Sequence, residues 1–177
     1  MRSRLSMMGF ALLAGLAISP VSALAQSQAN DERVLAQSGD GFNVGSVELL
    51  IQKGDAASSS GNLPVARKYY DDARNASKQL LSFYRDLSGA FRGLDARIPR
   101  EMDLKGRQAL DLLAQANLRL AALFRRQNQP EIAVPVLVEV VKLMTPSQAE
   151  GQKAYQSLIE LGFVDTPFSG AKTTTSN

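Results

Sequence analysis

The sequence contains no cysteine, no histidine and no tryptophan. Without cysteine, no disulfide can cross-link the fold and no thiolate can act as a nucleophile, so packing alone must stabilise the chain. Without histidine, the chain lacks the commonest transition-metal ligand and the usual general base at neutral pH. It also has no glycine-rich phosphate loop and no nucleophile motif. These absences predict a protein that is not an enzyme and that uses no cofactor and no metal.

Carboxylates are among the acid–base groups that remain. Asp95, Glu101 and Asp103 fall near an expected loop and could in principle supply an acid–base pair. Their spacing does not distinguish them from solvated surface acids, so we disfavour an enzyme that uses carboxylates alone. The chain also lacks a basic cluster interleaved with aromatic side chains, which disfavours a nucleic-acid partner.

The first 25 residues have the organisation of a secretory signal peptide. Arg2 and Arg4 form a positive start, Gly9–Ile18 is a short apolar stretch, and Ala23-Leu24-Ala25 fits a cleavage site. The apolar stretch is too short to span a bilayer comfortably. We therefore expect cleavage and export to the periplasm or an equivalent lumen, or secretion. An uncleaved signal would instead anchor the protein to the membrane.

The exported chain divides into three segments by composition. Residues 26–46 are polar and rich in glycine, serine, asparagine and aspartate, which predicts a flexible leader. Residues 164–177 end in a run of threonine and serine and predict a disordered tail. Residues 47–163 lie between them and carry helical periodicity, which predicts a single helical domain.

Residues 47–103 predict two helices. The first covers residues 47–58 and ends at the serine- and glycine-rich residues 59–62. The second begins near Leu63, with Pro64 in its first turn, where the missing N–H costs little. Its apolar residues recur every three or four positions for seven turns or so, which predicts an unusually long helix. We expect Ile98-Pro99 to close this segment.

Residues 104–163 predict three more helices. The third covers residues 104–127, and the fourth covers residues 130–143. The fourth is rich in β-branched residues and could pass for a buried strand, but Pro135 and the absence of a partner strand favour a helix. The fifth begins at a capping box, residues 145–148, and ends at Gly162, a glycine suited to the left-handed position after a helix.

Residues 50–73 carry a spaced pattern of large apolar, glycine, small, aromatic and small residues: Leu50, Gly54, Ala66, Tyr70 and Ala73. This pattern resembles the tetratricopeptide repeat. In such a repeat the small residues let two antiparallel helices approach closely, and the aromatic residue fills the gap beyond them.

A second, weaker match follows after an interval close to two repeats. It consists of Leu120, Ala121, Phe124, Ala133, Leu137, Val140 and Pro146. The interval between the two matches, residues 79–112, does not fit the pattern. The resemblance implies an all-α fold of antiparallel helical hairpins stacked as a short right-handed solenoid, with the fifth helix as a C-terminal cap.

The resemblance also implies a binding face. Members of this family that bind peptides hold a terminal carboxylate with basic and amide residues on the inner face of each first helix. Ile51 and Asp55 stand at the matching positions of the first repeat and cannot do this. The second repeat presents five candidate partner-binding residues on that face: Gln115, Leu118, Ala122, Arg125 and Arg126.

Positive charge is concentrated in the middle of the chain. Removal of the two signal arginines lowers the net formal charge from +3 to +1. Residues 74–126 then hold 11 basic and 5 acidic residues, while the flanking segments are net acidic. One hypothesis is that this basic middle docks an acidic partner or an anionic lipid. The other is that it forms solvated helix faces with i,i+4 ion pairs such as Asp103–Arg107.

Taken together, these features predict an exported scaffold that binds a protein or peptide, acidic in one hypothesis, by preorganised shape and charge. The alternative is a peripheral envelope protein that is held at a membrane by an uncleaved signal or by a basic helical face.

Overall fold

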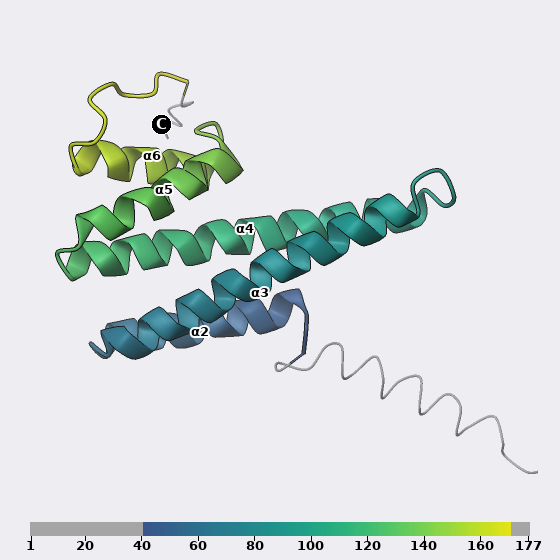
Figure 1. Cartoon of the computed structure of the whole chain (residues 1–177), viewed down its shortest axis with the longest axis horizontal. Coiled ribbons are helices and arrows are strands. Elements are labelled where there is room, and N and C mark those ends of the chain that lie inside the picture. Colours follow the sequence, from purple (N-terminus) through teal and green to yellow (C-terminus); the bar gives the residue numbers. More distant parts are fainter. Residues whose placement is uncertain (1–40, 171–177) are drawn as a thin grey trace, which may run out of the picture. The chain divides into compact units, whose positions relative to one another are not determined.

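The computed structural model describes residues 41–170, and this part of the chain contains five helices and no strand (Figure 1). They are α2 (Val44–Ser59), α3 (Leu63–Ala90), α4 (Arg97–Arg126), α5 (Pro130–Met144) and α6 (Ala149–Glu160). The all-α prediction is therefore confirmed for the described residues. The predicted signal peptide, leader residues 26–40 and tail residues 171–177 lie outside them.

α2 begins three residues before its predicted start, inside the segment that we expected to be leader. The side chain of Asn43 accepts a hydrogen bond of 2.9 Å from the backbone N–H of Ser46. An asparagine at this position satisfies an N–H group that the first turn of a helix leaves without a partner. This cap makes Val44 the first helical residue.

α2, α4 and α6 end in the same way. The residue after each C-cap has a positive φ: Gly61 (79°), Asn128 (57°) and Gly162 (75°). In each case the next backbone N–H donates back to a carbonyl in the last turn, as Phe163 does to Leu158 at 3.0 Å. These bonds satisfy carbonyl groups that the helix end leaves free. The prediction of a terminating glycine at 162 is confirmed.

α4 starts seven residues earlier than predicted, so the expectation that Ile98-Pro99 closes the preceding segment was wrong. Pro99 is the third residue of α4. In the first turn a backbone N–H has no intrahelical acceptor, so a proline there removes nothing that the helix needs. A proline can therefore lie in the first turn of a helix as readily as after its end, and the residues before the proline do not distinguish the two cases.

The start of α6 also differs from its prediction. The expected capping box at residues 145–148 does not form, because α6 begins only at Ala149 and has no side-chain cap. Thr145 has a positive φ of 54°, and its hydroxyl lies 2.6 Å from the Ser147 hydroxyl. The four residues form the turn from α5 to α6, and Gly151 packs against that turn: a Cβ there would lie 1.8 Å from the Thr145 carbonyl oxygen.

α5 is a helix, as predicted, although Pro135 lies inside it. Its buried residues recur every one, three or four positions, which places them on one face: Ala133, Val136, Leu137, Val140 and Met144. Of the β-branched residues that suggested a strand, Val136 and Val140 lie on this buried face, while Ile132 and Val138 are exposed. Tertiary burial outweighs their weak preference for strands.

Successive helices pack against each other, and two alternate pairs, α2 with α4 and α4 with α6, are also in contact. α2 and α3 approach each other closely at two small residues. Gly54 and Ala66 are buried, and a Cβ on Gly54 would lie 2.4 Å from the Tyr70 ring. Only glycine leaves room for the ring at this crossing.

The most extensive packing joins α3 and α4, which are 28 and 30 residues long. Figure 1 shows their loop-connected ends continuing past α2, α5 and α6. We call residues 85–107 the distal hairpin, and the remaining helical residues the proximal bundle. Ser88 and Asp103 fix the register of the distal hairpin, because the serine hydroxyl donates to the carboxylate at 2.9 Å.

The first residues of the predicted tail are described as far as residue 170 and form no helix or strand. The Tyr155 side chain of α6 contacts this segment. The Tyr155 hydroxyl donates a 2.7 Å hydrogen bond to the carbonyl of Thr166, and its ring lies 6.5 Å from that of Phe168 between centroids. This segment therefore lies along α6.

Candidate functional site

Charged side chains hold the helices of the proximal bundle together. Asp55 of α2 accepts hydrogen bonds from Arg119 Nε of α4 at 2.8 and 3.0 Å, and from the Tyr70 hydroxyl of α3 at 2.7 Å. Burial, the hydrogen bond to Asp55 and its negative charge raise the pKa of Tyr70 to about 12. The Asp55 carboxylate thus links three helices, and its hydrogen-bond partners all lie within the chain.

A second cross-helix group joins α3 to α5. Arg74 and Lys78 both pair with Glu139, and the Lys78 Nζ lies 2.8 Å from the carboxylate. Burial alone would raise the pKa of Glu139, but the hydrogen bonds and charges of Lys78 and Arg74 outweigh it and hold the pKa below its ordinary value. The carboxylate is therefore ionised at neutral pH and binds the two cations.

Two of the predicted partner-binding residues also join helices. Arg125 donates to Glu160 of α6 at 3.0 Å, and Arg126 donates to the Ser58 hydroxyl of α2 at 2.7 Å. The two neighbouring arginines at the end of α4 thus point in different directions, one toward α6 and the other toward α2. Both have internal partners, and the structure does not bring them together as one binding surface.

The other three predicted residues are spread along α4. Gln115 lines a shallow pocket of about 260 Å³ between α2 and α4, together with Asp55 and Arg119. Leu118 is half-buried and packs against the core, while Ala122 is exposed. A partner-binding role for these residues stays a prediction.

Four arginines differ from all others in the described part of the chain, because their side chains form no ion pair and no hydrogen bond there. They are Arg85, Arg92, Arg100 and Arg107. All four lie in the distal hairpin and are exposed. The basic middle of the sequence is therefore not one surface: its other arginines pair with a carboxylate or, in the case of Arg126, donate to Ser58, and these four do neither within the described residues.

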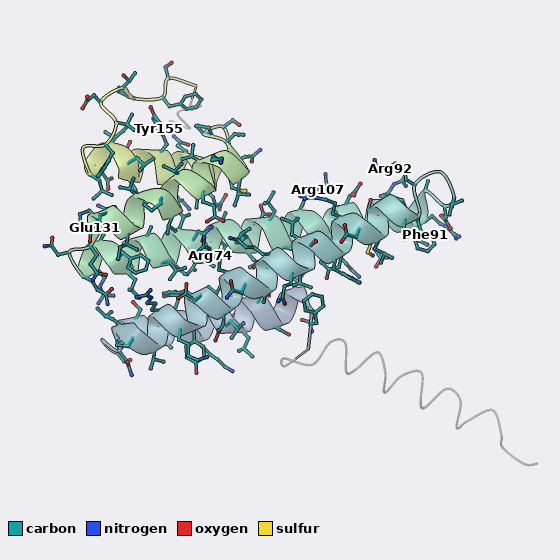
Figure 2. All side chains as sticks on the ribbon, in the orientation of Figure 1. Arg74, Phe91, Arg92, Arg107, Glu131 and Tyr155 are labelled. Atoms are coloured by element: carbon teal, nitrogen blue, oxygen red, sulfur yellow. The ribbon has the colours of Figure 1, made fainter. Side chains whose placement is uncertain are left out.

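The four unpaired arginines line two adjoining pockets between α3 and α4. The pockets have volumes of about 320 and 370 Å³ and share Arg92, Asp103 and Arg107. Figure 2 shows Arg92 and Arg107 on the same side of the loop-connected end of α3 and α4. We call the combined depression the arginine groove. It can hold an anionic group without first breaking an internal ion pair.

The predicted i,i+4 pair between Asp103 and Arg107 is not present. Asp103 instead accepts the hydrogen bond from Ser88, a buried residue of α3. Of the other acids of the hairpin, Asp95 pairs with Arg97 and Glu101 pairs with Lys105, while Asp86 accepts a 3.4 Å hydrogen bond from the Ser82 hydroxyl. Asp103 is therefore the one carboxylate that lines the arginine groove.

The sequence predicted the excess of positive charge but not which of the arginines form ion pairs. A signal for the groove exists in the spacing: the four arginines recur at intervals of seven, eight and seven residues. Seven residues are two helical turns, so each helix places its pair on one face. Which arginines have partners depends on residues as distant as Asp55 and Glu139, and this cannot be seen in the local sequence.

No family model matches the chain, and neither the curated proteins nor the solved structures yield a match to it. Within residues 41–170, no helix is both long enough and apolar enough to cross a membrane. The same residues contain no group of three or more acidic side chains that could hold a metal ion.

Proposed function

We propose that this chain is an exported, non-catalytic scaffold of the tetratricopeptide type, which binds an acidic segment of a protein partner in the arginine groove. The observation that carries the proposal is the distribution of ion pairs. Every described arginine outside the groove has a partner within the chain, and the four that have none line one depression.

The helix contacts support a repeat-like arrangement. α2 contacts α4 and α4 contacts α6, so alternate helices touch as well as successive ones. A stack of helical hairpins makes contacts of this kind, since the first helices of neighbouring hairpins lie side by side. The close approach of Gly54 and Tyr70 also agrees with the repeat pattern. In this arrangement α6 takes the place of a cap helix.

The chemistry of arginine supports an anionic partner. A guanidinium group is always charged near neutral pH and binds carboxylates through two parallel hydrogen bonds. An arginine that is already paired must first exchange its partner, whereas the groove arginines exchange only water. Four such groups around one depression give a local positive potential that also speeds encounter with an acidic partner.

Binding of a labelled acidic peptide to the exported chain, measured by fluorescence anisotropy, tests the proposal. We expect the double charge reversal Arg92→Glu/Arg107→Glu to weaken binding about tenfold or more, because it removes two bidentate contacts and repels the peptide. Binding to the unaltered chain should also weaken as salt is added.

The matched control is Arg97→Glu/Lys105→Glu. It makes the same change in net charge in the same hairpin, but both residues are paired with neighbouring acids and neither lines the groove. Equal losses in both variants would mean that net charge alone attracts the peptide, and the groove would then not be a site. Measuring both variants with anionic vesicles tests the alternative, a peripheral envelope protein held by its basic face.

A further inference from the structure

The four groove arginines form two pairs, and each pair has one arginine from α3 and one from α4. Arg85 and Arg92 are seven residues apart on α3, and Arg100 and Arg107 are seven residues apart on α4. Seven residues of α-helix rise by about 10.5 Å. Counting outward from the contact of Ser88 with Asp103 places Arg85 beside residue 106 and Arg92 beside residue 99. Each arginine of α3 thus lies next to one of α4.

Apart from the arginines, the residues that line the groove are mainly apolar, with one acid. Leu81, Met102 and Leu110 are apolar residues that line the pocket of about 320 Å³, and Pro99 lines the pocket of about 370 Å³. Asp103 lies between Arg100 and Arg107 on α4 and lines both pockets. Positive charge therefore occurs at two levels along the groove, about two helical turns apart, with a negative charge between them.

We infer that the segment bound in the arginine groove is an amphipathic helix with carboxylates at positions i and i+7 and no acid between them. This inference rests on the proposed function and specifies the partner. In a helix that lies along α3 and α4, residues i and i+7 are separated by the same rise as the two arginine pairs. Each of its two carboxylates can therefore contact one arginine pair at the same time. Apolar residues on the same stripe, at i+3 and i+4, face the apolar lining.

Other occupants match this spacing less well. An extended peptide covers about 10.5 Å in about three residues, and an odd step places two side chains on opposite sides of the chain. A membrane surface presents phosphates over a plane, whereas these pockets are recessed between two helices. Asp103 would also repel an evenly distributed negative charge, but it repels a helix with carboxylates only at the two ends of the stripe less strongly.

Three alanine-rich peptides of about 20 residues, long enough to be helical, test the inference by calorimetry with the exported chain. The first carries glutamates at i and i+7, the second carries the same residues at i+3 and i+4, and the third is the first with a central proline. We expect the first to bind about tenfold more tightly than either of the others. The proline breaks the helix without changing the charge.

Asp103→Asn provides an independent measurement. Asparagine keeps an oxygen that can accept the hydrogen bond from Ser88, but it removes the central negative charge. We expect this variant to bind the second peptide several-fold more tightly and to bind the first peptide more tightly by a clearly smaller factor, because the first peptide holds its carboxylates away from residue 103. Thermal unfolding of the variant shows whether the fold is retained.

The possible failures are distinguishable. If all three peptides bind equally and Arg92→Glu/Arg107→Glu still abolishes binding, the helix inference is wrong and the proposed function stands. If no peptide binds more tightly to the unaltered chain than to that variant, the proposed function fails as well. Binding of anionic vesicles without binding of any peptide would replace both with a membrane role.

Discussion

The proximal bundle and the distal hairpin differ in how their charged residues are paired. The proximal bundle has two local pairs within α3, Arg67–Asp71 and Lys68–Asp72, but it also has ion pairs that cross between helices: Arg119 with Asp55, Arg125 with Glu160, and Arg74 and Lys78 with Glu139. In the distal hairpin the ion pairs are local, within a few residues of each other, and four arginines have no partner in the described chain.

The number of neighbouring helices explains this difference. Where three helices meet, a long side chain on one can reach a carboxylate on another, and partial burial strengthens the pair. Where only α3 and α4 pair, their outer faces have no such neighbour, and charges there remain available to a partner. Under the proposed function, the proximal bundle provides stability and the distal hairpin provides binding.

The largest expected effect tests the packing of the proximal bundle. In Gly151→Ala, the new Cβ would lie 1.8 Å from the Thr145 carbonyl oxygen, so backbone has to move. We expect the free energy of unfolding to fall by roughly 3 kcal/mol, the upper part of the range for overpacking. Urea unfolding followed by circular dichroism measures it. A loss below about 0.5 kcal/mol would show that the α5–α6 turn is loosely packed.

A smaller effect tests the cross-helix ion pairs. The lowered pKa of Glu139 means that its carboxylate stabilises the fold fully above its ordinary pKa of 4.5, and that this contribution is lost as pH falls through the lower pKa of the folded state. We expect Glu139→Gln to cost about 1 kcal/mol at neutral pH, with the difference from the unaltered chain vanishing in acid. Urea unfolding between neutral pH and pH 3 measures this.

The control for Glu139 is Glu101→Gln in the distal hairpin. Glu101 pairs with Lys105 one helical turn away and joins no second helix. We expect its loss to change the free energy of unfolding by no more than about 0.5 kcal/mol. Comparable effects at the two positions would contradict the distinction between cross-helix and local pairs.

The smallest effect is a gain, and it lies in the distal hairpin. Gly106 is inside α4, and a Cβ there would lie 3.8 Å from the Tyr84 Cβ, an ordinary contact distance. We expect Gly106→Ala to stabilise the chain by about 0.5–1 kcal/mol, since alanine loses less conformational entropy in a helix. Thermal unfolding measures the gain. A loss instead would mean that the distal hairpin is packed as tightly as the turn at Gly151.

Most of the helical pattern was predictable, and the errors occurred at helix starts. The steps of three and four in α3, the terminating Gly162 and the helix at residues 130–144 all agree with the structure. Pro99 and the turn at residues 145–148 were misinterpreted. Proline and threonine serve equally in turns and in first helical turns, and the packing of distant residues decides between these uses.

The candidate site was predictable only in its net charge. The excess of basic residues in the middle of the chain was visible, and so was their spacing. The pairing was not visible: the predicted Asp103–Arg107 pair is absent, and Arg125 and Arg126 have partners on α6 and α2. Most of these partners are more than 30 residues away along the chain.

The sequence by itself determined that the described residues form helices, because the period of apolar residues and the conformational preferences of glycine and proline act within a few residues. Only the tertiary structure decided which arginines are neutralised. An ion pair depends on a separation of about 4 Å between side chains, and helix packing, not position in the sequence, sets that separation. Four arginines at one end of α3 and α4 have no partner among residues 41–170, and that outcome defines the groove.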